Sequence, residues 1–148
     1  MNAYSRAPNL AAYQSVAAQT SVDTADPHRL VLLLLDGALD RINSARGCLE
    51  HKSLVEKTRH LHRAIQIIDE LRDSLNLRVG GPIAANLLDL YDYMRRQLMK
   101  ANLENRIEPM TEVMSLLQTL RGGWSAIAPT VHGEPTGNAT RPILDVVR

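Results

Sequence analysis

The chain has 148 residues, of which 45% are hydrophobic and 22% charged, a composition typical of one soluble globular domain. Its 17 Lys and Arg residues nearly balance its 16 Asp and Glu residues, so the basic excess that attracts nucleic acid is missing. The lone cysteine, Cys48, can form neither an intramolecular disulfide nor a multi-cysteine zinc site, which favours the cytosol. The longest apolar run, Leu30 to Leu35, has six residues, whereas a membrane span needs roughly 20. We therefore expect a cytoplasmic protein that neither inserts into a membrane nor binds nucleic acid.

The first predicted helix begins at Asp26-Pro27 and runs to about Glu50. Aspartate offers an N-cap oxygen to the free amides of the first turn, and proline has the φ angle of a first helical residue. The apolar residues repeat at alternating steps of four and three, which places them on one helix face: Val31, Leu35, Ala38, Ile42, Ala45 and Leu49. Leu32 and Leu39 add a second apolar face.

Two further helices follow in chain order. Ser53 and Glu56 have the spacing of a capping box, which predicts a helix from about Ser53 to Leu77. The sequence Gly80-Gly81-Pro82 predicts a sharp break and a new helix that begins with the proline. Asn102 to Asn105 should close this third helix.

The fourth predicted helix starts between Ile107 and Pro109 and reaches Ile127. Because the connections are short, we expect an all-α fold, an antiparallel up-and-down four-helix bundle over residues 26–128. Residues 1–25 are weakly amphipathic and predict a mobile segment with a short fifth helix. Residues 129–148 contain three of the seven prolines and predict a disordered tail. The end of this tail is apolar and could dock on the bundle through Ile143, Leu144, Val146 and Val147. A solvated tail is the favoured interpretation.

Patterns for catalysis and metal binding are missing from the sequence. A bundle that holds two iron ions uses Glu-x-x-His, and none of the five histidines has a carboxylate three residues before it. No His or Asn is arranged around Cys48 to activate it as a nucleophile. Two aspartate pairs at a spacing of four each have an arginine nearby, which favours a charged outer face over an acid–base pair: Asp36 with Asp40 and Arg41, and Asp69 with Asp73 and Arg72. We therefore expect no enzyme, no cofactor and no metal, and a binding or structural role.

Three stretches are more specific than a generic bundle requires. They are Thr24-Ala25-Asp26-Pro27-His28-Arg29-Leu30 with Leu35-Asp36-Gly37-Ala38, then Gly80-Gly81-Pro82-Ile83-Ala84-Ala85-Asn86-Leu87 with Leu90-Tyr91-Asp92-Tyr93-Met94, and finally Leu120-Arg121-Gly122-Gly123-Trp124. In this order, over about residues 10–130, they resemble the FliS family of flagellar secretion chaperones. One departure is Leu35, where the family usually has an aromatic residue, so an aromatic contact is lost or replaced by aliphatic packing.

The resemblance implies a cytoplasmic export chaperone without enzymatic activity. Its client would be the disordered C-terminal segment of flagellin, which it would keep from premature polymerisation. The resemblance also implies that the chaperone assists delivery of its client to the flagellar type III export apparatus. It further implies contact with the export gate and a homodimer. Ordering such a client costs about 2–5 kcal/mol of the gross interaction energy, which demands a long interface.

The first helix carries the candidate platform for this client, because its six-residue apolar run covers every side of a helix. The candidate residues on it are Leu32, Leu35, Asp36, Ala38, Leu39 and Ala45. Ala38 and Ala45 leave either a shallow track for a guest backbone or room for two bundle helices to pack tightly, and the sequence favours neither.

Two further groups complete the candidate site. Tyr93, Arg96 and Lys100 are expected to border an exposed groove, whereas Trp124 should anchor the core. The family resemblance also implies that Leu10 and Tyr13 cover the groove or present the complex to the export gate.

A self-associating helical adaptor without a flagellin client is the alternative function, because the same amphipathic seams suffice for it. Co-purification of a flagellin distinguishes the two. An enzyme with a metal site in the bundle is disfavoured by the missing Glu-x-x-His pattern.

Overall fold

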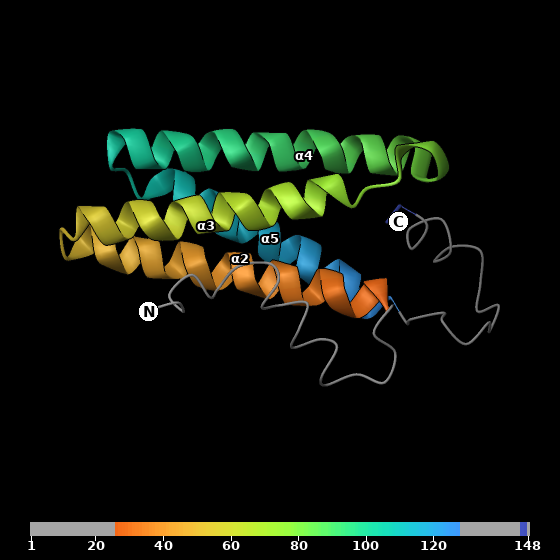
Figure 1. Ribbon diagram of the computed structural model, residues 1–148, viewed down its shortest axis with the longest axis horizontal. Coiled ribbons are helices and arrows are strands. Elements are labelled where there is room, and N and C mark those ends of the chain that lie inside the picture. Colours follow the sequence, from red (N-terminus) through yellow and green to blue (C-terminus); the bar gives the residue numbers. More distant parts are fainter. Residues whose placement is uncertain (1–25, 128–145, 148) are drawn as a thin grey trace, which may run out of the picture.

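The computed structural model describes residues 26–127 together with residues 146 and 147 (Figure 1). The expected N-terminal segment 1–25 and most of the expected tail 129–148 therefore lie outside the described residues. Over the described part the chain forms four helices, namely α2 (Pro27–Glu50), α3 (Leu54–Asp73), α4 (Leu77–Glu104) and α5 (Glu108–Ala126). Helix α2 packs against α3 and α5, and α4 packs against the same two helices. The predicted four-helix bundle is confirmed.

An aliphatic core fills the space between the four helices, as a chain without phenylalanine requires. Its largest side chains are fully buried. On α2, Leu35 and Ile42 come from the predicted apolar face, whereas Leu34 lies outside it, so the periodic pattern indicates the core face but not its full width. The largest buried side chains are Leu34, Leu35, Ile42, Leu61, Ile67, Ile68, Leu71, Met94, Leu98, Met110, Val113 and Leu117.

The start of α2 is fastened to the end of α5. Asp26 is the N-cap as predicted, and its side chain accepts hydrogen bonds from the backbone amides of His28 and Arg29. Trp124 is buried, which confirms it as a core anchor, and its indole Nε1 donates to the carbonyl oxygen of His28 over 3.0 Å. In return, His28 Nε2 lies 2.8 Å from the carbonyl oxygen of Trp124, and the two rings stack. This reciprocal pair joins two helix ends that are far apart in the sequence.

Helix α3 differs from its prediction at both ends. The Ser53 side chain makes no capping hydrogen bond, so the predicted capping box is wrong. The helix also ends at Asp73 instead of Leu77. The early end has a physical cause, because Asn76 serves as the N-cap of α4 and accepts a hydrogen bond from the amide of Val79.

Helix α4 begins at Leu77, five residues before the predicted start at Pro82. The predicted break is real, but it is a kink within the helix. Gly81 adopts φ 56° and ψ −133°, outside the helical region and accessible to glycine without strain. At the other end, Asn105 caps the helix in the left-handed conformation with φ 53°, so the predicted end between Asn102 and Asn105 is confirmed.

The described end of the chain returns to the bundle. Val146 is fully buried, and its carbonyl oxygen accepts a hydrogen bond from the backbone amide of Asn76. Val147 forms an isolated β-bridge with Leu75. Figure 1 shows this piece of chain beside the connection between α3 and α4. For these two residues the favoured interpretation of a solvated tail is wrong, and the docking alternative holds.

Candidate functional site

The predicted platform on α2 is largely core. Leu35, Ala38 and Ala45 have no exposed surface and belong to the buried cluster. Their burial favours the interpretation that small residues let helices pack tightly, and these positions offer no surface to a partner in the described structure. Leu35 also shows how the sequence accommodates the missing aromatic residue, since aliphatic packing fills this position.

The remaining α2 candidates lie at the edge of the core. Leu32 and Leu39 are half-buried against the core cluster. Asp36 forms an ion pair with Arg121 of α5, in which the guanidinium Nε and Nη2 donate to the two carboxylate oxygens. The hydrogen bond to Asp36 raises the pKa of Arg121. Asp36 therefore ties α2 to α5, a role that does not require a partner protein.

Tyr93 and Arg96 meet at the boundary between α4 and α5. The Tyr93 hydroxyl donates to Glu112 over 2.7 Å, and Gln97 donates to the other Glu112 oxygen over 2.9 Å. The Arg96 guanidinium carbon lies 5.9 Å from the centre of the Tyr93 ring. Because its hydroxyl donates to a carboxylate, the pKa of Tyr93 is raised. Tyr93 and Arg96 thus form a polar cluster on this surface, and they do not line the pocket described next.

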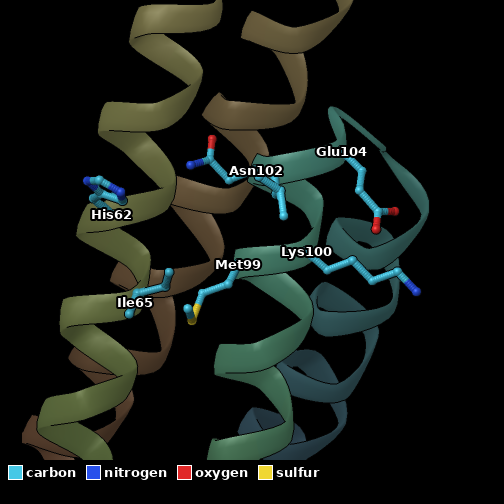
Figure 2. Close-up of a pocket in the computed structure, with 7 residues that line it drawn as sticks. His62, Ile65, Met99, Lys100, Asn102 and Glu104 are labelled. Carbon is cyan, nitrogen blue, oxygen red and sulfur yellow. The ribbon is translucent and has the colours of Figure 1, made fainter.

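An open pocket of about 390 Å³ lies between the outer faces of α3 and α4. Figure 2 shows Ile65 of α3 and Met99 of α4 pointing toward each other across it, while Lys100 and Glu104 extend away from α3. Leu103 also lines the pocket and is 83% exposed, and Met99 is 49% exposed. Met99 and Leu103 lie one turn apart on α4, and large apolar side chains this exposed beside the half-buried Ile65 indicate a contact surface. We call Ile65, Met99 and Leu103 the apolar groove.

Farther along the same two helices the surface becomes charged. Arg95 of α4 donates to Asp69 of α3 over 3.1 Å, and Arg72 of α3 donates to Asp92 of α4 over 2.7 Å. A polar pocket of about 290 Å³ lies among these side chains and Asp73. The interpretation of Asp69 and Asp73 as a charged outer face holds, although the main partner of Asp69 is Arg95 and not the predicted Arg72.

Hydrogen bonds join the start of α3 to the end of α4 beside the apolar groove. The Lys57 side chain is buried, and its Nζ donates to the carbonyl oxygen of Asn102 over 2.9 Å and to the Asn105 side chain. Thr58 donates to the Asn102 side chain over 2.9 Å, so Asn102 links two helices as expected. Burial lowers the pKa of Lys57. These contacts fix the register at which Met99 and Leu103 face α3.

The sequence reasoning missed all three residues of the apolar groove, namely Ile65 of α3 and Met99 and Leu103 of α4. Lys100 of α4, which was predicted, does line the pocket. The signal was available in the pattern. The core seam of this helix is complete with Met94, Leu98 and Ala101, so the two apolar residues one helical turn apart beyond that seam are surplus to the core. Leu10 and Tyr13 lie outside the described residues.

Comparison with known proteins agrees with this fold and this sequence pattern. The family model described as "Flagellar protein FliS" matches residues 9–131. The flagellar secretion chaperone FliS of Salmonella typhimurium is 41% identical over 124 residues, which cover 83% of this chain and 92% of that protein. The flagellar secretion chaperone FliSB of Pseudomonas aeruginosa is 40% identical over 116 residues, which cover 78% of this chain and 92% of that protein.

The chain belongs to the FliS family. A more distant relative, the FliS of Bacillus subtilis, is 35% identical over 106 residues, which cover 72% of this chain and 78% of that protein. The FliS match spans all four described helices, including the Gly80-Gly81-Pro82 kink and the apolar groove. None of the described helices of this FliS-family chain is long and apolar enough to cross a membrane.

Proposed function

We propose that this chain is a cytoplasmic export chaperone that binds the disordered C-terminal segment of flagellin. It keeps flagellin from polymerising prematurely and assists its delivery to the flagellar type III export apparatus. It acts by binding alone, without catalysis and without a cofactor. The names of its relatives support a flagellar export chaperone.

The observation that carries the proposal is the exposed apolar groove between α3 and α4. A disordered segment that folds on contact can lay the apolar face of a helical turn on Ile65, Met99 and Leu103. Methionine has an unbranched, polarizable side chain and adapts to the shape of its guest. The start of α3 contacts the end of α4, so we take these two helices as antiparallel and the groove as running along both.

The charged half of the same surface supplies polar contacts for the rest of the client. Arg72 and Arg95 each hold a carboxylate across the α3–α4 boundary, and all four side chains keep part of their surface in solvent. A client with its own charged residues can pair with them at the rim. Leu32 and Leu39 on α2 remain a second proposed contact, and Leu10 and Tyr13 are proposed to cover the groove or to face the export gate.

Substitutions in the groove test this proposal. We expect Met99→Glu with Leu103→Glu to weaken binding of a flagellin C-terminal segment at least tenfold, or about 1.4 kcal/mol, in a calorimetric titration. Both side chains are exposed, so the bundle should keep its thermal stability. Val55→Glu is the matched control, because Val55 is 72% exposed on α3 and does not line the pocket.

The same variants also distinguish the flagellin chaperone from the self-associating adaptor. Unchanged binding in the groove variant would exclude the groove as the client site. If the parent chain instead bound no flagellin but formed a dimer that the groove variant abolished, the self-associating adaptor would be the better assignment.

A further inference from the structure

Val146 and Val147 dock at the α3–α4 connection, against Leu75, Asn76 and Gly80. We call the site formed by these three residues the seat. The amide of Asn76 is available there, because Asn76 is the N-cap of α4 and its N–H has no partner within that helix. The carbonyl oxygen of Val146 accepts this amide, and Leu75 pairs with Val147 as a short β-bridge. Leu75 and Val146 are both buried by the arrangement.

Gly80 gives the seat its depth. A Cβ atom at this position would lie 2.9 Å from both the Cα and the Cγ1 of Val146, and 2.7 Å from the Cβ of Ala84. Val146 therefore approaches the backbone of α4 more closely than any residue with a side chain at position 80 would allow. The first glycine of the Gly80-Gly81-Pro82 kink makes room for Val146, whereas the second makes the bend.

We propose that Val146 and Val147 are a self-docked ligand of this seat, and that the seat accepts an extended apolar segment when the chain end leaves. The seat recognises one backbone carbonyl through Asn76 and one β-branched side chain over Gly80, a combination that an extended strand presents and a helix does not. In the first part of α4, Leu77, Val79 and Ile83 are 48%, 51% and 37% exposed, and release of the valines would uncover Leu75 next to Asn76 as a further apolar side chain.

The chain end thereby acts as an autoinhibitory clasp. While Val146 is in place, no other strand can pair with Asn76 or reach Gly80. The seat is an inference from this chain alone. Only the identity of the competing segment, an extended apolar part of flagellin, rests on the proposed function.

Backbone amide exchange at Asn76 tests the clasp directly in the 148-residue chain. In Val146→Asp the buried side chain becomes charged, and in Gly80→Ala the new Cβ collides with Val146, so we expect the Asn76 amide to exchange at least about tenfold faster in both. Gly47→Ala is the control, because a Cβ at this helical glycine meets nothing within 4 Å. Equal exchange rates in the parent chain and Val146→Asp would overturn the docking.

Binding in trans tests the seat as a ligand site. A peptide with the sequence of residues 141–148 should protect the Asn76 amide in the Val146→Asp chain but not in the parent, where the seat is filled. The same peptide with its own Val146→Asp change should give no protection. If the unaltered peptide failed to restore protection, the seat would not be a binding site and the proposal would be overturned.

A flagellin C-terminal segment completes the test. We expect it to bind the Val146→Asp chain several-fold more tightly than the parent and to displace the peptide. Equal affinity for both chains with the peptide still bound would overturn the autoinhibition while leaving the proposed function intact. Failure of the segment to bind either chain would contradict the proposed function, and the peptide experiment would then decide the seat alone.

Discussion

At the scale of single residues, His60 makes the stability of the fold depend on pH. Its ring Nδ1 lies 3.1 Å from Arg41 Nη1 on the neighbouring helix, and burial followed by the charge of Arg41 lowers the pKa of His60 below its usual 6.5. Between that lowered pKa and 6.5 the unfolded chain binds more protons than the folded chain. The contribution of His60 to stability is therefore complete above pH 6.5 and is lost as the pH falls through the pKa of the folded state.

Urea unfolding at pH 7.5 and pH 5.0 should reveal this contribution as a loss of unfolding free energy at the lower pH. His60→Gln should make that difference smaller, because glutamine does not titrate. Arg41→Gln should move the pKa of His60 back toward its usual value in an NMR titration, since the adjacent positive charge is gone. A pKa of His60 at or above 6.5 in the parent chain would contradict this account.

Lys57 is the second residue with a distinct prediction. From a buried position, its ammonium group donates to the Asn102 carbonyl oxygen near the end of α4 and to the side-chain oxygen of Asn105. Lys57→Met keeps the apolar stem but leaves the Asn102 carbonyl without its partner, so we expect a loss of about 1–3 kcal/mol in the free energy of unfolding. Lys100→Met, an exposed lysine on α4, should change it by less than about 0.5 kcal/mol. Equal effects of the two substitutions would show that burial of Lys57 contributes nothing.

At the scale of elements, the kink in α4 depends on one glycine. Gly81 has φ 56° and ψ −133°, a backbone conformation that glycine adopts freely but that costs a residue with a side chain about 1–3 kcal/mol. Gly81→Ala should therefore lower the free energy of unfolding by that amount, although a Cβ there has open space around it. Gly47→Ala, within the regular helix α2, should raise it by about 0.5–1 kcal/mol. Chemical denaturation of the two variants checks the opposite signs, and a stabilising Gly81→Ala would contradict the requirement for glycine at the kink.

The elements themselves could be predicted where their signals are local. Asp26-Pro27 marks the start of α2 correctly, because the capping oxygen and the amides that it satisfies lie within one turn. The end of α3 could not be predicted in this way. Its position depends on Asn76 capping the next helix and on Leu75 pairing with Val147 from the other end of the chain. Long-range contacts of this kind leave no pattern in the local sequence.

At the scale of the whole molecule, the fold was more predictable than the binding surface. The six-residue apolar run from Leu30 to Leu35 pointed to a platform on α2, but α2 packs against both α3 and α5, which buries Leu35 and Ala38. The apolar groove needs Ile65 and Met99 from two different helices to face each other. Periodicity identifies the apolar faces of single helices, and only the packed bundle shows which surplus apolar residues meet.

The central claim is that this chain binds the C-terminal segment of flagellin. Calorimetric titration of the 148-residue chain with that segment from the same genome, against a flagellin N-terminal segment as control, tests it most directly. We predict one-to-one binding of the C-terminal segment with a negative heat-capacity change, because apolar surface is buried, and no binding of the N-terminal segment. Absence of binding to the C-terminal segment, or equal binding to both segments, would contradict the claim.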